Sequence, residues 1–399
     1  MKGFVQDGTL QSKEIIKSSR CGACALFKRK GCNSPKMGVV GKGEKGILFV
    51  LPPVHEQEDE LGKYLITKQG RWLSQILQQQ GIDPIRDCWF TSSLICHSPK
   101  FDNENVDYCR FILDKTIQNL KPISIIPMGK ESIRSVIYLS SNIKVKDPNR
   151  WIHWRIPSQW MNTWIMPTHS YYGEQENSLV LRRFKKHVLA AIEPKKRPWK
   201  EIPKWEEAIH ILNETQALKF IAKLTASKEA FAFDYETTTL KPEGPASEIA
   251  SVAISIRGRV TAAFSWNQRV AASMGHLLRN PAYKVAANCK FEERWTRKVL
   301  GISVRNWAWD TMQASHCLDN RQGITSVEFN AFILLGFPNY AEDIKPYLRS
   351  EGSYSPNQIF QIPLSKLLKY NGLDALLEWK MAEKQIVMMD HPIRRKLKI

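Results

Sequence analysis

The sequence has no apolar run near the length of about 20 residues that a membrane-spanning helix needs. Its first residues, 1–7, lack the apolar region of a signal peptide. It also contains no internal repeat and no low-complexity segment. We therefore expect a globular protein of the cytoplasm that has no membrane partner.

Acidic residues are scarce relative to basic ones. The 399 residues include 39 Asp and Glu against 58 Lys and Arg, which gives a formal net charge of +19. A surplus of this size favours a polyanionic partner, because neutralising phosphates releases counterions. The alternative is a soluble protein that is merely basic. The 13 Trp and 11 Tyr residues favour nucleic acid, since aromatic rings can stack on exposed bases.

Cysteines number eight, and in the cytoplasm they are more often thiols or metal ligands than disulfides. Cys21 and Cys24 form a Cys-x-x-Cys motif, and Cys96 and Cys109 follow. Four thiolates can hold zinc or an iron-sulfur cluster, whereas a Cys-x-x-Cys pair alone also fits redox chemistry or chance. The cysteines expected to be ordinary thiols are Cys32, Cys88, Cys289 and Cys317.

A basic, proline-rich segment at residues 193–204 is the clearest domain boundary, because it has three prolines and no apolar period. We predict an N-terminal domain over residues 1–192 and a C-terminal domain over residues 205–399. Basic side chains near this boundary are candidate DNA contacts, although a solvated helix face is the alternative for the first four. These residues are Arg182, Arg183, Lys185, Lys186, Lys195, Lys196 and Arg197.

Short apolar strands alternate with helical patterns in the N-terminal domain. This rhythm predicts an α/β fold, with a mostly parallel sheet covered by helices. Ligands of such sheets bind at the carboxyl ends of the strands, so the segments after Val50, Phe90 and Met166 are candidate binding sites. The expected strands cover residues 47–50, 88–91, 123–126 and 163–166.

Four carboxylates and a tyrosine in the C-terminal domain have the spacing of a two-metal nuclease site. Asp234 and Glu236 lie two residues apart after an apolar run, so in a strand they project from one face. Glu292 opens a helical pattern, and Tyr370 and Asp374 share a helix face at i, i+4. Two divalent cations about 4 Å apart activate water and stabilise the leaving oxygen in phosphodiester hydrolysis, and such cations prefer carboxylates.

Three residues near these positions have simpler interpretations. Glu292 taken alone is an ordinary first-turn glutamate, stabilised by the helix dipole. Asp310 is expected to accept hydrogen bonds from nearby backbone or to pair with a basic residue rather than bind metal. Gly372 weakens its helix by about 1 kcal/mol, so it is kept either for close packing or for access to substrate.

Residues from about 205 to 390 resemble the 3′-5′ exonuclease domain of family A DNA polymerases, in the DnaQ-like superfamily and its tyrosine subtype. The resemblance implies a ribonuclease H-like mixed sheet with helices. The matching segments, in family order, are Asp-Tyr-Glu-Thr-Thr at 234–238, Asn-Cys-Lys-Phe-Glu at 288–292, Trp-Asp-Thr-Met at 309–312 and Tyr-Asn-Gly-Leu-Asp at 370–374.

The same resemblance implies roles for the individual residues. Asp234, Glu236 and Asp374 would hold two magnesium or manganese ions, and Tyr370 would orient the attacking water. Glu292 would support the second ion. It departs from the family, whose second motif usually ends in Asp, and its extra methylene could shift the metal spacing and lower the activity.

The N-terminal domain resembles family 4 uracil-DNA glycosylases. That family carries a four-iron, four-sulfur cluster, and the resemblance implies that Cys21, Cys24, Cys96 and Cys109 are its ligands. The segments that match, in order, are Cys-Gly-Ala-Cys at 21–24, Gly-Ile-Leu-Phe-Val at 46–50, Glu-Gln-Glu-Asp at 56–59, Ile-Cys-His-Ser-Pro at 95–99, Cys109 and Pro-Thr-His at 167–169.

The residues that would excise uracil are largely replaced. Pro52 stands where the family has an acidic residue that helps to activate water, Leu65 where it has the stacking aromatic ring, and Ser92 where it has the Asn that recognises uracil. His169 is retained, as a structural residue or a DNA phosphate contact. We therefore expect DNA binding without uracil excision. The acidic residues that could still act as a base are Glu56 and Glu58.

The order of the two domains resembles the front part of certain bacteriophage DNA polymerases. Only 25 residues follow Asp374, so we expect no polymerase domain in this chain and either a separate polymerase subunit or independent action in repair. The leading hypothesis is a 3′-5′ exonuclease on single-stranded or frayed DNA ends, in the cytoplasm of a bacterium or a phage-infected host. The alternatives are a DNA-binding scaffold with a vestigial site and an active uracil-DNA glycosylase fused to an exonuclease.

Overall fold

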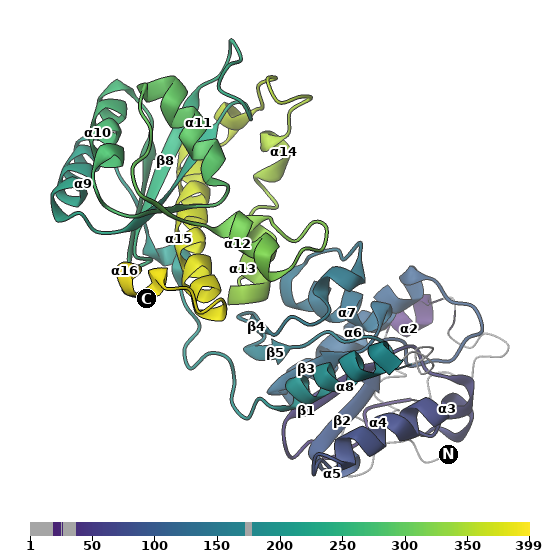
Figure 1. The fold of residues 1–399 in the computed structure, drawn as a ribbon. Coiled ribbons are helices and arrows are strands. Elements are labelled where there is room, and N and C mark those ends of the chain that lie inside the picture. The colour runs from purple at the N-terminus through teal and green to yellow at the C-terminus, as the bar shows by residue number, and fades with distance from the viewer. Residues whose placement is uncertain (1–18, 25, 27–36, 172–177) are drawn as a thin grey trace. The chain divides into compact units, whose positions relative to one another are not determined.

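The computed structural model describes residues 19–24, 26, 37–171 and 178–399. The chain divides into two compact units, Met1–Ile202 with Gly336–Pro338 and Pro203–Leu335 with Asn339–Ile399 (Figure 1). The division after Ile202 falls inside the predicted linker. Cys32, expected to be an ordinary thiol, lies outside the described residues.

Among the described residues of the first unit, five strands form a sheet in the order β2-β1-β3-β5-β4. All neighbouring strands pair in parallel except β4 and β5, which are antiparallel. The predicted α/β fold with a mostly parallel sheet is therefore confirmed. The strands are β1 (Ile47–Leu51), β2 (Cys88–Ser92), β3 (Ser124–Pro127), β4 (Ile156–Ser158) and β5 (Thr163–Ile165).

Helices of the first unit begin at residues suited to capping. Asp102 caps α6 in a capping box with Asn105, and Thr67 caps α4 through its hydroxyl group. The helices of this unit are α2 (Ser19–Ala23), α3 (Glu56–Leu61), α4 (Lys68–Gln78), α5 (Pro84–Asp87), α6 (Asn103–Leu120), α7 (Lys130–Ser141), η1 (Pro148–Trp151) and α8 (Ser178–Ile192).

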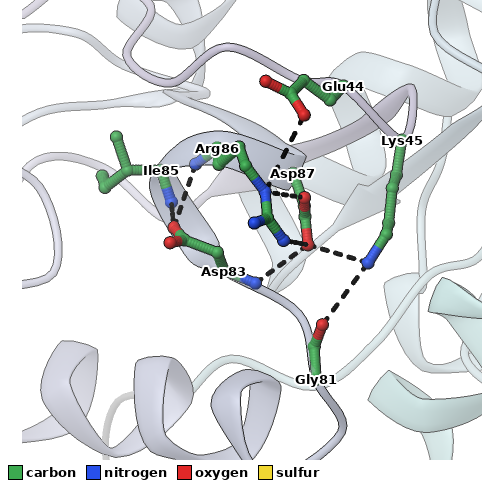
Figure 2. A network of polar contacts seen from close by, with 7 residues as sticks. All are labelled: Glu44, Lys45, Gly81, Asp83, Ile85, Arg86 and Asp87. Atoms are coloured by element: carbon green, nitrogen blue, oxygen red, sulfur yellow. Dashed lines mark hydrogen bonds and ion pairs between the residues drawn. The ribbon is translucent and has the colours of Figure 1, made fainter.

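A polar network fixes the entry into β2 (Figure 2). The buried Asp87 carboxylate accepts hydrogen bonds from Arg86 Nε and Lys45 Nζ, both at 2.8 Å, and from the Asp83 backbone N–H at 2.9 Å. The bond from Arg86 is the main reason that the pKa of Asp87 lies well below its usual range. Because Lys45 lies two residues before β1 and Asp87 directly before β2, the network joins the entries of two paired strands.

The sheet of the second unit has six strands in the order β11-β10-β7-β8-β9-β6. β8 is antiparallel to both β7 and β9, whereas the β7–β10, β10–β11 and β6–β9 pairs are parallel. The expected ribonuclease H-like mixed sheet is therefore confirmed. The strands are β6 (Ile209–Ile211), β7 (Phe231–Thr237), β8 (Ile249–Ile256), β9 (Val260–Ser265), β10 (Lys284–Ala286) and β11 (Trp307–Asp310).

Helices cover this sheet, and the long helix α15 runs along one face of it (Figure 1). Asn213 and Gln216 form a capping box at the start of α9. The helices of the second unit are η2 (Trp205–Ala208), α9 (Glu214–Ser227), α10 (Gln268–Arg279), α11 (Cys289–Leu300), α12 (Thr311–Leu318), α13 (Val327–Leu335), α14 (Lys345–Leu348), η3 (Ile359–Gln361), α15 (Leu364–Met388) and α16 (Ile393–Leu397).

The two faces of β7 differ in side-chain size. Phe231, Phe233 and Tyr235 pack with residues of α9, α10 and α11 in one hydrophobic core. Ala232, on the other face, packs with Trp379 of α15. Because side chains alternate along a strand, Asp234 and Glu236 project from the same face as Ala232, toward α15.

Small residues allow α15 to approach the sheet closely. Ala253 of β8 and Ala263 of β9 form a hydrophobic cluster with Leu368 and Ala375 of α15. A Cβ atom on Gly372 would lie only 2.3 Å from Ile209 Cγ2. The structure thus supports close packing as the reason for this glycine.

The described residues include no helix that is both long and apolar enough to cross a membrane. The segment predicted as a linker makes ordered contacts with the first unit. The Arg197 guanidinium donates hydrogen bonds to Lys121 O at 2.6 Å and to Asn162 O at 2.9 Å, and Trp199 Nε1 donates one to Pro157 O at 2.7 Å.

Candidate active site

Three carboxylates converge between β7 and α15. Asp234, Glu236 and Asp374 each offer an oxygen atom, and these atoms lie within 4.8 Å of one another. The alternation of β7 directs the first two toward α15, and the helix carries the third on the facing side. Carboxylate oxygens this close together form a ligand set suited to a hard divalent cation.

Burial dominates the electrostatics of the group. It raises the pKa of Asp234 to about 7, and it raises the pKa of Glu236 and Asp374 well above their usual range. Repulsion among the three carboxylates raises the pKa of Glu236 and Asp374 further. A bound cation would remove this repulsion and favour the ionised forms, so the arrangement suits metal binding.

An asparagine that the motif interpretation did not assign holds Asp234 in place. Asn371 Nδ2 donates a hydrogen bond to Asp234 Oδ2 at 2.6 Å, which opposes the effect of burial on the Asp234 pKa. The Asn371 side chain is oriented in turn by Ser251, whose hydroxyl donates to Asn371 Oδ1 at 2.9 Å. Asn371 lies inside the third motif, so its position in the sequence could have identified it as a residue of the site.

Two phenols lie at Asp374. Tyr370, predicted from the i, i+4 spacing, lies near enough to Asp374 to lower its pKa against the effect of burial, and its ring centroid lies 5.8 Å from that of Tyr340. The Tyr340 hydroxyl donates a hydrogen bond to the Asp374 carboxylate. Sequence reasoning missed Tyr340, because it lies outside every motif and reaches the site only through the fold.

Glu292 lies in the first turn of α11, as expected, and is 1% exposed. Asn288, which begins this turn, has φ 63°, a left-handed conformation that asparagine tolerates better than most residues. Glu292 is not one of the three clustered carboxylates. A further buried acid, Glu378, follows Asp374 by one helical turn and was not predicted.

Asp310 accepts hydrogen bonds from backbone N–H groups, as expected. Its carboxylate binds the N–H groups of Asn288 at 3.1 Å and Cys289 at 2.9 Å, and those of Met312 and Gln313 at 3.0 and 3.1 Å. Asp310 therefore caps α12 and also fixes the turn that presents Glu292. Its role in the site is structural.

The four candidate cluster cysteines all lie in or against the hydrophobic core of the first unit. Cys96 and Cys109 are buried in the hydrophobic core of that unit, and Cys21 and Cys24 pack against the same core. Asn105 Nδ2 donates a long hydrogen bond to Cys24 Sγ at 3.7 Å.

The residues compared above with the uracil-excision positions of the glycosylases make contacts within the first unit. The Ser92 hydroxyl donates to Pro52 O at 2.5 Å. Leu65 is buried at φ 63°, and its N–H donates to Glu58 Oε1 at 2.8 Å. His169 has its ring 5.5 Å from that of His153. Glu58 is thus buried and accepts a hydrogen bond within the fold, whereas Glu56 is exposed.

The basic residues around the linker that were predicted to contact DNA are exposed, but two of them make hydrogen bonds within the first unit. Lys185 Nζ donates a hydrogen bond to Gln79 Oε1 at 3.1 Å, and Arg197 binds backbone carbonyl groups as described above. The residues of this set that are exposed are Arg182, Arg183, Lys185, Lys186, Lys195, Lys196 and Arg197.

Comparisons with known proteins match both units. The family model described as a 3′-5′ exonuclease matches residues 209–384. The DNA polymerase of Bacillus phage SP01 is 25% identical over 413 residues, which cover 93% of this chain and 43% of the polymerase. The type-4 uracil-DNA glycosylase of Pyrobaculum aerophilum is 30% identical over 131 residues, which cover 32% of this chain and 63% of the glycosylase.

Among solved structures, RNase D of Escherichia coli aligns with a TM-score of 0.32 and 13% sequence identity, covering 46% of this chain and 45% of that one. The chain spans less than half the length of the phage polymerase that it matches. Residues 209–384 thus match the 3′-5′ exonuclease domain of the family A DNA polymerase type, and the chain is similar along most of its length to a phage DNA polymerase.

Proposed function

We propose that the chain is a metal-dependent 3′-5′ exonuclease that trims single-stranded or frayed DNA ends. The observation that carries this proposal is the convergence of Asp234, Glu236 and Asp374 within 4.8 Å, inside a segment that matches an exonuclease family. The surplus of basic residues is consistent with a polyanionic substrate. Proofreading beside a separate polymerase subunit would be one use of this activity.

Two magnesium or manganese ions would complete the site. Asp234, Glu236 and Asp374 would hold them, with Glu292 supporting the second, and bound ions would acidify water and stabilise charge on the scissile phosphate. The Tyr370 hydroxyl, held beside Asp374, would hydrogen-bond to the attacking water and orient it toward the phosphate. Asn371 would keep the Asp234 carboxylate in a fixed orientation.

A nuclease assay with defined ends tests the proposal. Single-stranded DNA labelled at its 5′ end is incubated with the full chain and Mg²⁺ or Mn²⁺, with D234A and with the control D343A. Asp343 is exposed in the same unit and pairs with Lys366. We expect a ladder of shortened products from the wild type and D343A, and none from D234A. Equal background cleavage by all three would refute the proposal.

The same assay separates a nuclease from a DNA-binding scaffold, and it also determines the substrate preference and the polarity of trimming. Salt-sensitive DNA binding without trimming would instead indicate a vestigial scaffold, the alternative motivated by Glu292 in the position usually held by Asp. A single-stranded RNA of the same sequence, run in parallel, determines which nucleic acid is preferred, because a protein distinguishes the two through the 2′-hydroxyl. A block at the 3′ end should abolish trimming if the polarity is 3′-5′.

For the first unit we propose a four-iron, four-sulfur cluster held by Cys21, Cys24, Cys96 and Cys109, in a domain that binds DNA without excising uracil. The placement of the four thiols at one hydrophobic core suits such a cluster, which is shielded from solvent. Purified protein should be brown and contain about four iron atoms per chain. Colourless protein loaded with zinc would contradict this assignment.

The side chains at the positions compared with the uracil site support the proposal that uracil is not excised. Ser92 uses its hydroxyl for Pro52 O and Leu94 O, and Leu65 supplies no aromatic face. A pocket without a stacking ring and a bidentate amide loses both affinity and discrimination for uracil. Uracil-containing DNA treated with the protein and then with alkali should therefore stay intact, and strand breaks at uracil would indicate an active glycosylase.

A further inference from the structure

Two buried glutamates beside the three clustered carboxylates each have an oxygen atom without a hydrogen-bond partner. Glu292 and Glu378 are both 1% exposed, and the Oε2 atom of each has no hydrogen-bond partner in the part of the chain that the structure describes. Leaving a buried carboxylate oxygen unsatisfied is costly, because the charged group has lost its water. A cation bound by these two oxygens would offset this cost.

Glu378 is held in a defined orientation. Its Oε1 atom accepts a hydrogen bond from the backbone N–H of Ala287 at 3.1 Å, directly after β10. β10 pairs in parallel with β7, with Lys284 opposite Phe231, so continuing this register places Ala287 level with Asp234. The contact thus anchors Glu378 at the end of β10, the end that leads into the turn before Glu292, and leaves Oε2 available.

The neighbours of Glu378 are acidic. After burial, the charges of Asp234, Glu292 and Asp374 are the largest influences that raise its pKa. Asp374 precedes it by four residues on α15, so the two side chains emerge from the same helix face. Among the described residues, the main causes of the raised pKa of the two buried glutamates are burial and acidic neighbours, with no basic side chain among them.

We propose that Glu378 and Glu292 together bind a divalent cation adjacent to the group formed by Asp234, Glu236 and Asp374. This inference rests on the proposed function, because it assigns a ligand that completes the second cation site of the exonuclease. The glutamate at position 292 has one methylene more than the usual Asp, and Glu378 supplies a second oxygen for the cation that this longer side chain reaches.

The test is the binding of Mn²⁺ to the metal-stripped full chain, measured by the electron paramagnetic resonance signal of free Mn²⁺. The variant E378Q keeps an oxygen acceptor for Ala287 N–H but removes the charge. The control E383Q lies further along α15, where Glu383 is partly exposed and binds Lys380 and Trp379.

We expect wild type and E383Q to bind two Mn²⁺ ions at this site. In E378Q the affinity for one ion should fall by roughly 10- to 100-fold, while D234A should weaken both. E292Q should weaken the same ion as E378Q, and the double variant should be little worse than either single one, because both changes remove the same cation. E292Q also serves as the test if E378Q does not fold.

Wild-type binding of both ions by E378Q, or a single ion in the wild type, would overturn the inference. Such results would not bear on nuclease activity, which is measured separately with DNA. Conversely, two Mn²⁺ ions that depend on Glu378 in a protein that trims no DNA would refute the proposed function and leave the cation site standing.

Discussion

The replacement of Gly372 by alanine tests whether close packing of α15 positions the active site. Gly372 lies between Tyr370 and Asp374, and an added Cβ would approach Ile209 Cγ2 to 2.3 Å. Overpacking of this kind costs about 1–3 kcal/mol, whereas replacing Gly by Ala within a helix contributes about 1 kcal/mol of stability. We therefore expect a net loss of up to about 2 kcal/mol in the free energy of unfolding.

Gly275 in α10 provides a matched control. It is also a buried glycine within a helix of the second unit, but an added Cβ there would meet nothing within 4 Å. G275A should stabilise the unit by about 0.5–1 kcal/mol, because only the helix propensity changes. The two substitutions are chemically identical, so the opposite signs isolate the contact with Ile209.

Calorimetry of the full chain measures both effects. The unfolding transition of the second unit is identified as the one whose midpoint Mn²⁺ shifts, because a ligand stabilises the unit to which it binds. G372A should lower the midpoint of this transition by up to roughly 8 °C, whereas G275A should raise it by roughly 1–4 °C. In the background I209A, which removes the clashing methyl group, G372A should lose most of its cost. Stabilisation by both alanines would refute the packing argument.

Three further predictions concern other parts of the chain. N371L removes the hydrogen bond to Asp234 and should raise its pKa above about 7, so the pH at which Mn²⁺ binding becomes half-maximal should move upward in a titration from pH 5 to 9. D87N should destabilise the first unit by about 1–3 kcal/mol at pH 7. Folding lowers the pKa of Asp87, so its ionised carboxylate stabilises the fold fully at pH values above its unfolded pKa of about 3.9. When unfolding is measured at falling pH, the wild type should lose this stabilisation, whereas D87N, which has no carboxylate at this position, should show no such loss. K186A should reduce the salt dependence of DNA binding by about one counterion. R197A should mainly lower thermal stability, because its guanidinium donates to the backbone carbonyl groups of Lys121, Pro122 and Asn162.

Periodicity predicted the parts of the site that local sequence determines. The apolar run before Asp234 and the two-residue spacing to Glu236 placed both on one face of a strand, and β7 has this form. The i, i+4 spacing of Tyr370 and Asp374 likewise predicted a shared helix face on α15. Both inferences used only the regular spacing of side chains along a strand or a helix, which does not depend on the rest of the fold.

The missed residues depend on contacts between distant segments. Tyr340 lies 34 residues before the Asp374 carboxylate to which it donates, and Glu378 is fixed by a backbone N–H 91 residues away. Neither contact leaves a periodic trace in the sequence. Glu378 did carry a weak signal, because an acid four residues after Asp374 on an otherwise buried stretch of helix needs a partner.

The same features that make the site suitable for metal make the metal-free fold less stable. Asp234, Glu236 and Asp374 are buried beside one another, and their raised pKa values mean that folding without a cation favours their protonated forms. A carboxylate must be ionised to bind a metal, so proton release and metal binding are coupled at this site. Small residues on both sides of the contact, above all Gly372 of α15 and Ala263 of β9, keep the helix close enough for a cation to bridge it to β7. Close packing and metal affinity are therefore two consequences of one feature of the sequence, the small side chains on the face of the sheet that carries the acids.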